Sequence, residues 1–271
     1  MDDDTYLKEF AMNRQLKVLT VGNSFGKDTS KHIYDIARSL GFESVRVCVL
    51  YIGGCSLNKH YENALGDLPL YAYHTNCDGE WQITEGKCIS EAIAEDDWDY
   101  ISIQHGTADG SRYTLPESYV KLEALIAYIK KLAHKKTKIV FNMAWVMATD
   151  GTHPEIRFYA GDQLLMYKKL TELTSTVVEG TKGLDIVSPA GTAVQNARVY
   201  GLPDDKLMRD GFHMSYGLGR YIAGLTFIKA LTGVEIDGIE WCPEDVTKEE
   251  KDIAIRCANA AIEHPYSITK I

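Results

Sequence analysis

Leu16-Lys17-Val18-Leu19-Thr20-Val21-Gly22-Asn23-Ser24-Phe25 joins a largely apolar run to a turn. The first six residues have the composition of a strand that is buried in a sheet. Gly22 and Asn23 then favour a turn. A side chain that follows a parallel strand stands at the carboxyl edge of the sheet, where open α/β folds bind their ligands. The segment therefore predicts a central first strand over 16–21, with Ser24 at the ligand-binding edge.

Strand-like and helix-like segments alternate along the rest of the chain. Strands are predicted at 16–21, 45–51, 100–104, 138–143 and 184–188. Helices are predicted at 29–40, 88–95, 117–133, 154–178, 215–231 and 248–263. Such alternation is typical of a parallel sheet with helices on both faces. We therefore expect an α/β fold, a three-layer α/β/α sandwich whose central parallel sheet has about five strands and is wound as in flavodoxin.

The stretch 61–86, rich in Tyr, Trp, Asn and Gly, is too irregular for a simple crossover. We expect a hairpin or a substrate-facing loop there. No repeat, low-complexity tract or Pro/Gly/Ser linker interrupts the sequence. We therefore expect one domain over 1–271, with its core at about 16–232 and a C-terminal helix at about 248–263.

The charge of the chain limits its partners. Its 271 residues carry a formal net charge of −9 without a concentrated basic face, which argues against nucleic-acid binding. No run approaches the roughly 20 apolar residues that cross a bilayer, so no membrane span is expected.

The acidic start Met1-Asp2-Asp3-Asp4 lacks the features of a signal peptide and indicates a cytoplasmic protein. If a signal peptide had been removed, the protein would be periplasmic or secreted. The sequence does not indicate an oligomeric state.

Neither a metal nor an organic cofactor is expected. Six cysteines are spread without a Cys-x-x-Cys pair, and no His/Asp/Glu cluster has the spacing of metal ligands. Gly-x-Gly-x-x-Gly and P-loop spacings are missing as well. Most of the cysteines are expected to be buried thiols. Cys77 and Cys88 flank a turn-rich segment and could form a disulfide in an exported protein.

A second motif, Asp210-Gly211-Phe212-His213, lies near the other end of the chain. Ser24 needs a neighbouring base to become a nucleophile, and His213 is the candidate base. Asp210 stands three residues before it, an offset that lets a carboxylate reach the imidazole, fix its tautomer and stabilise its charged form. Together the three residues supply the nucleophile, base and orienting group of a hydrolase triad.

Each member of this triad also has a structural explanation. Serine is favoured at helix N-caps, Asp-Gly is a common turn, and a histidine is usually structural or exposed. Asp28 and Thr29 lie nearer to the predicted helix start, and either can cap the helix in place of Ser24. The serine and the Asp-x-x-His motif together favour the triad.

Three motifs stand at the ends of predicted elements in a fixed order. Gly22-Asn23-Ser24-Phe25 follows the first strand, Gly53-Gly54 follows the second, and Asp210-Gly211-Phe212-His213 precedes the last large helix. This order resembles the SGNH (GDSL-type) hydrolases. Residues 51–57, 98–101, 191–198 and 217–221 are similar to a little-characterised bacterial branch of that superfamily. The resemblance covers about 16–232 and implies a serine esterase that forms an acyl-enzyme, with O-acetylated carbohydrate as the implied substrate class.

The resemblance also implies an oxyanion hole. Backbone N–H groups of Ser24 and Gly54 would donate to the charge that develops on the substrate oxygen. The alternative for Gly53 and Gly54 is a tight turn alone. The family's third donor is an asparagine in Gly-x-Asn-Asp, whereas this chain reads Gly106-Thr107-Ala108-Asp109. Gln104 carries an equivalent amide and is the candidate third donor, although it could instead cap the sheet edge.

Trp145, Tyr73 and Trp81 are candidates for a substrate wall, because aromatic faces suit sugar rings and acyl chains. For each of them, a place in the core is the alternative. Two other functions stay open at this point. One is a non-catalytic glycan-binding protein on the same scaffold, which the missing asparagine favours. The other is a flavodoxin-like cofactor binder that holds phosphate at a helix N-terminus.

Overall fold

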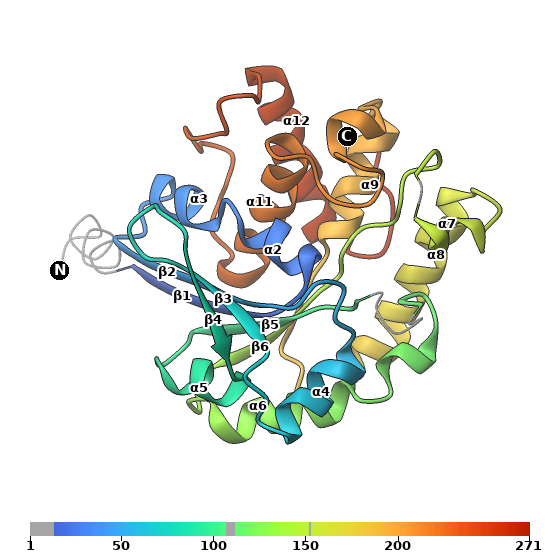
Figure 1. Cartoon of the computed structure of the whole chain (residues 1–271). Helices are drawn as coiled ribbons and strands as arrows, with labels where there is room; N and C mark the ends of the chain where they lie inside the picture. The colour runs from blue at the N-terminus through green and yellow to red at the C-terminus, as the bar shows by residue number, and fades with distance from the viewer. Residues whose placement is uncertain (1–13, 107–111, 152) are drawn as a thin grey trace.

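The computed structural model describes residues 14–106, 112–151 and 153–271. Their strands form one seven-stranded sheet in the order β4-β3-β2-β1-β5-β6-β7 (Figure 1). The five parallel strands are β1 (Gln15–Gly22), β2 (Ser44–Tyr51), β5 (Tyr100–Ile103), β6 (Lys138–Asn142) and β7 (Ile186–Ser188). An antiparallel hairpin of β3 (Tyr71–Asn76) and β4 (Gln82–Lys87) extends the sheet at one edge.

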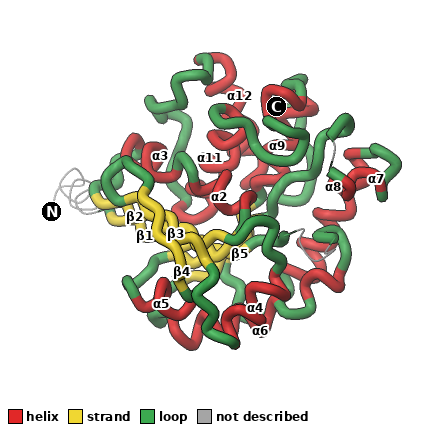
Figure 2. Tube along the Cα trace, in the orientation of Figure 1, coloured by secondary structure: helices red, strands yellow, loops and turns green. Residues whose placement is uncertain are grey.

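Helices cover both faces of this sheet (Figures 1 and 2). One face carries α2 (Ser24–Ser30), α3 (Ile33–Ser39), α9 (Ala190–Tyr200), α11 (Leu218–Thr232) and α12 (Lys248–Glu263). The other face carries α4 (Leu57–Leu65), α5 (Ile89–Ala94) and α6 (Leu122–Leu132). Shorter elements are a 3-10 turn (Pro116–Tyr119), α7 (Pro154–Arg157), α8 (Gln163–Leu173), a π-helical turn (Thr174–Val178) and α10 (Asp204–Leu207). The predicted three-layer α/β/α sandwich with five parallel strands is confirmed.

The apolar run that opened the sequence forms the central strand β1. Val18, Leu19 and Val21 are fully buried there, between β2 and β5. In the parallel register, Gly22 at the end of β1 pairs with the last residue of β2. The neighbouring Val21 pairs with Ile103 at the end of β5. The loops after these three strands therefore leave the sheet at one carboxyl edge.

The helix predicted at 29–40 begins earlier and is divided in two. Asn23 is the N-cap of α2, and its side chain accepts a hydrogen bond from the Phe25 N–H at 3.0 Å. The prediction that Asp28 or Thr29 caps this helix is wrong, because both are buried inside α2. A short break then separates α2 from α3.

Other predicted elements differ in their bounds. The helix predicted at 154–178 is interrupted where Ala160 and Gly161 take left-handed backbone angles, with φ of 52° and 78°. The irregular stretch 61–86 contains the end of α4 and the β3–β4 hairpin, so the hairpin alternative is confirmed. The helix α9 was not predicted, whereas α12 has the predicted bounds.

None of the six cysteines, all of which lie in the described ranges, forms a disulfide. Cys77 is exposed, while Cys88 is buried and its thiol donates to the Asp67 carbonyl at 3.1 Å, so the disulfide between them is not formed. Within the described ranges, no helix is both long and apolar enough to cross a membrane. Among the same described residues, no three or more His, Cys, Asp or Glu side chains form a group that could hold a metal ion.

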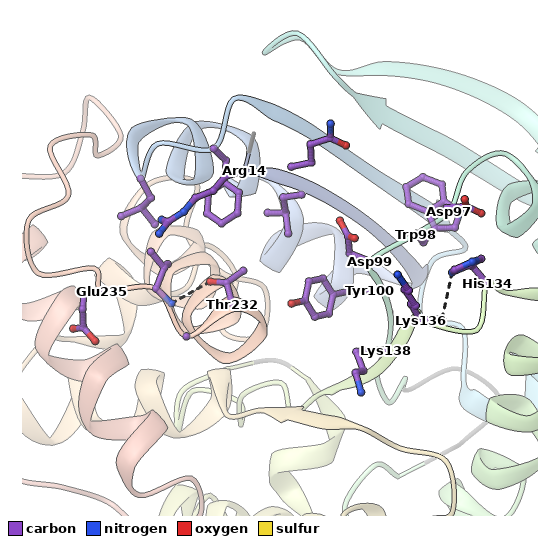
Figure 3. A pocket seen from close by; sticks show the side chains of 16 residues that line it. Arg14, Asp97, Trp98, Asp99, Tyr100, His134, Lys136, Lys138, Thr232 and Glu235 are labelled. Carbon is purple, nitrogen blue, oxygen red and sulfur yellow. Dashed lines mark hydrogen bonds between the residues drawn. The ribbon is translucent and has the colours of Figure 1, made fainter. Parts of the chain in front are cut away.

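A cavity of about 1240 Å³ lies at the amino ends of the parallel strands (Figure 3). Gln15, Tyr100 and Lys138, at the starts of β1, β5 and β6, line it together with Thr232 and Glu235. Ser24 follows the opposite end of β1. The cavity is therefore separate from the carboxyl edge that carries the predicted functional residues.

Candidate active site

The Asn23 side chain holds three loops together at the carboxyl edge of the sheet. Its Nδ2 donates to the carbonyls of Cys55, at 3.0 Å, and His105, at 2.9 Å. These residues follow β2 and β5 respectively. Gly106 comes so close that a Cβ there would stand 1.9 Å from the Cys55 carbonyl oxygen. Only glycine fits at this junction, so the loops after β1, β2 and β5 pack closely together beside Ser24.

Ser24 is the first residue of α2 and is half-buried. Because the Asn23 side chain caps the helix, the capping role that was the alternative for Ser24 is already filled. The position at a helix N-terminus also places the positive end of the backbone dipoles beside the hydroxyl.

Gly54 lies in a tight turn directly after β2. The Cys55 N–H donates to the Ile52 carbonyl at 3.2 Å, and Gly54 has a φ of +65°. A positive φ at the third position of a turn is typical of type II, which favours glycine. The turn explains the residue type, while the role of the Gly54 N–H as an oxyanion donor stays a prediction.

Gln104 is fully buried beneath the start of α2. Its amide nitrogen lies 3.5 Å from the Val21 carbonyl oxygen. A Cβ on Gly22 would come within 2.2 Å of that amide nitrogen, and one on Gly26 within 2.6 Å of the amide oxygen. This placement matches the alternative in which the Gln104 amide caps the sheet edge. Its role as the third oxyanion donor stays a prediction. Residues 107–109 of the compared motif lie outside the described residues.

Asp210 and His213 are hydrogen-bonded to each other. The Asp210 Oδ2 lies 2.7 Å from His213 Nδ1, and its Oδ1 accepts the backbone N–H groups of Phe212, at 3.2 Å, and His213, at 2.8 Å. Burial by itself would raise the pKa of Asp210. The hydrogen bonds from the imidazole and from the two N–H groups outweigh burial and hold this pKa below its ordinary value.

The loop that carries His213 packs against α2 near Ser24. The ring centroids of Phe25 and His213 are 6.3 Å apart, in an edge-on arrangement. Behind them, Trp145 donates its indole N–H to the Phe212 carbonyl at 2.6 Å and packs its ring 5.2 Å from Phe25. Residues nearly two hundred positions apart in the sequence therefore lie at the same edge of the sheet.

The three aromatic candidates do not form one wall. Trp145 is fully buried in the contacts just described. Tyr73 is buried on β3, where its hydroxyl donates to Glu95, at the end of α5, at 2.6 Å. Trp81 donates to the carbonyl of Lys31, at the far end of α2 from Ser24, at 3.3 Å. Contact of any of them with a substrate stays a prediction.

His153 was not identified from the sequence. Its ring centroid lies 4.9 Å from that of Phe212. Burial lowers the pKa of His153, the charge of His213 lowers it further, and Asp210 acts in the opposite direction. Only folding brings this residue to the loop, and no spacing in the sequence signals it.

His105 is a second histidine at this edge, and it cannot serve as the base. Its ring is fully buried and stacks on Tyr113 with the centroids 4.1 Å apart. Burial lowers the pKa of His105 to about 3, so the imidazole is neutral and closed off from solvent. His213, which is partly exposed beside Asp210, is the better placed histidine.

Comparisons with known proteins identify the family and the fold of the chain. Residues 17–261 match a family described as a domain of unknown function (DUF4886). A crystal structure of a DUF4886 family protein from Bacteroides uniformis ATCC 8492 is 31% identical, with a TM-score of 0.88 over 95% of this chain and 98% of that chain. A variant acetyl xylan esterase from Geobacillus stearothermophilus is 15% identical, with a TM-score of 0.52 over 86% of this chain and 100% of that chain. A member of the lipolytic G-D-S-L family from Veillonella parvula DSM 2008 is 16% identical, with a TM-score of 0.48 over 80% and 98% of the two chains. Among curated proteins, none matches.

The sheet order, the helical layers and the likeness to the acetyl xylan esterase define the flavodoxin-like fold of the SGNH hydrolases. Because the family match spans most of its length, the chain belongs to the DUF4886 family.

Proposed function

We propose that this chain is a serine esterase that acts through an acyl-enzyme. The observation that carries the proposal is the bonded Asp210–His213 pair, packed beside the N-terminus of the helix that begins with Ser24. The low pKa of Asp210 keeps its carboxylate ionised, so that it orients the imidazole and stabilises the imidazolium.

In the proposed reaction, Ser24 Oγ attacks the ester carbonyl while His213 Nε2 takes the hydroxyl proton. The N–H groups of Ser24 and Gly54 stabilise the oxyanion of the tetrahedral intermediate, with Gln104 as the candidate third donor. His213 returns the proton to the leaving alcohol. A water molecule, deprotonated by the same imidazole, then releases the carboxylic acid and restores Ser24.

The proposed substrate class is O-acetylated carbohydrate. The likeness of the fold to an acetyl xylan esterase supports this choice, since the two chains superpose over most of their length. Contact of Tyr73, Trp81 or Trp145 with the substrate is kept as part of the proposal, and mutation of the partly buried Trp81 is its most direct test.

Hydrolysis of p-nitrophenyl acetate by wild type, Ser24→Ala and His213→Ala tests the reaction. Both variants should lose activity, and a fluorophosphonate should label wild type on the peptide that contains Ser24. Ser90→Ala is the matched control, because Ser90 lies on α5, on the other face of the sheet, where its hydroxyl donates to Asp67. Release of acetate from acetylated xylo-oligosaccharides tests the substrate class.

A non-catalytic glycan-binding protein is the competing proposal. It predicts that wild type neither turns over esters nor reacts with the fluorophosphonate, while calorimetry detects binding of unacetylated oligosaccharides. The flavodoxin-like alternative predicts a yellow protein that retains flavin on purification. Turnover that depends on Ser24 contradicts both.

A further inference from the structure

The Asp28 carboxylate is almost completely buried, with 1% of its side chain exposed, in the second turn of α2. Arg209 donates to both of its oxygens from Nη1, at 3.0 and 3.2 Å. Arg220 donates to Oδ1 from Nε at 2.8 Å and approaches the same oxygen with Nη2 at 2.7 Å. The backbone N–H of Met214 donates to Oδ2 at 3.0 Å. One carboxylate thus binds three groups, all from residues 209–220.

Two of these groups form the base of the loop that carries Asp210 and His213. Met208 and Met214 pair as an isolated antiparallel bridge. The Arg209 N–H donates to the His213 carbonyl at 3.0 Å, and the Arg209 guanidinium also donates to the Met214 carbonyl. Asp28 therefore holds the loop at the residue before Asp210 and at the residue after His213.

Helical geometry relates this contact to Ser24. Residues four apart lie on the same face of a helix, about one turn of ~5.4 Å from each other. Ser24 and Asp28 have this spacing within α2. The face of α2 that carries the nucleophile candidate also carries the carboxylate that anchors the His213 loop. Phe25, between them in sequence, packs against the His213 ring.

We infer that Asp28 is a positioning residue, which fixes the position of His213 relative to Ser24. The inference rests on the proposed function. A buried carboxylate loses most of its solvation, and only close, charged partners compensate for that loss. Here the partners are two guanidinium groups and one N–H, so the loop can neither slide along α2 nor lift from it without breaking charged hydrogen bonds. Catalysis is sensitive to such displacements, because a shift of about 1 Å in a reacting group can cost ~10²-fold in rate.

The test compares Asp28→Asn with Asp96→Asn. Asp96 is a matched control, since it also accepts from two cations, Lys17 at 2.7 Å and Arg46 at 2.8 Å, but lies away from the His213 loop. Both variants should lower the melting temperature. We expect only Asp28→Asn to lower kcat for p-nitrophenyl acetate, by about 10–100-fold, with KM nearly unchanged. Labelling of Ser24 by the fluorophosphonate should slow by the same factor.

A second readout needs no substrate. In protein labelled with ¹³C and ¹⁵N at histidine, the His213 ring signals should shift in Asp28→Asn and stay in place in Asp96→Asn. If Asp28→Asn does not fold, Arg209→Gln replaces it. That variant removes one partner of Asp28, and it should move the same signals and lower kcat to a smaller extent.

Unchanged kcat and unchanged His213 signals in a folded Asp28→Asn would overturn the inference. An equal loss of kcat in Asp96→Asn would also overturn it, because the effect would then come from general destabilisation. A wild-type protein that neither turns over esters nor labels at Ser24 would refute the proposed function instead. The His213 signals would then decide by themselves whether Asp28 holds the loop.

Discussion

Asp210 acts on His213 through both of its carboxylate oxygens. One oxygen faces the imidazole, and the other accepts two backbone N–H groups of the same loop. The side chain is therefore fixed before it orients the ring. This double attachment distinguishes the pair from an ordinary exposed Asp-Gly turn, in which the carboxylate bonds only to backbone.

Replacing Asp210 with Asn should separate orientation from binding. The amide would still accept from the backbone but would favour the wrong imidazole tautomer, so we expect kcat to fall by ~10²–10⁴-fold with KM nearly unchanged. Steady-state kinetics over a range of pH measure both parameters. An Asp210→Asn protein with near-normal kcat would instead indicate a Ser24–His213 dyad.

Gln104 has two possible roles, which one variant distinguishes. If its amide donates to the oxyanion, Gln104→Ala should lower kcat by ~10²–10³-fold without a matching rise in KM. If it only fills the space under Gly22 and Gly26, the variant should unfold at a lower temperature and retain its kcat in the folded state. Kinetics well below the melting temperature, together with thermal unfolding, give the answer.

At the scale of helices and strands, the sequence predicted elements whose apolar residues follow a clear period. The helix α12 is an example. Its N-cap residue Thr247 and Glu250 in its first turn form a capping box, and the helix has one buried face. The helix α9 was missed because residues 190–197 are buried on every side, which leaves no polar face to mark a period. The breaks in 29–40 and 154–178 depend on tertiary contacts and left-handed residues, which periodicity does not reveal.

The residues of the site show the same limit, because the sequence reveals only those that stand in a local motif. Ser24, Asp210 and His213 stand in short motifs, so they could be named from the sequence. Asp28 and His153 have no motif, because their partners are far away along the chain. From the sequence, Asp28 was one of two candidates for a helix cap, a local role, whereas its actual partners lie more than 180 residues later.

Glu155 in α7 makes stability depend on pH. Burial raises the pKa of this carboxyl to about 7, against the hydrogen bond from Thr114 and the charge of Arg112. Between about pH 4.5 and 7 the folded protein therefore keeps a proton that the unfolded chain releases, and stability from this group falls as pH rises through that window. The full change is about 3 kcal/mol.

We therefore expect the free energy of unfolding to fall less in Glu155→Gln than in wild type as the pH rises from 5 to 8. Urea unfolding at several pH values measures the difference. The exposed Glu117 provides the control, because Glu117→Gln should follow the wild-type curve. Parallel curves for wild type and Glu155→Gln would show that Glu155 is ionised in the fold.

At the scale of the whole molecule, one cluster of buried apolar side chains extends over both faces of the sheet. It includes Ile36 of α3, Ile126 of α6 and Leu225 of α11. We propose that the chain is one domain, and we expect a single cooperative unfolding transition. Far-UV circular dichroism and tryptophan fluorescence should give coincident melting curves. Two resolved transitions would contradict the proposal.

The two outer strands of the sheet, β4 and β7, are where another copy of the chain could add a strand. An open strand edge offers unpaired backbone groups to other chains and can seed aggregation. Here β7, at one rim, has three residues. At the other rim, β4 carries the charged Glu85 and Lys87, and its pairing with β3 shifts register between Tyr71 and Tyr73. A short strand and a charged, irregular one are poor templates for strand addition, so we expect neither edge of the sheet that carries the site to pair with another copy of the chain.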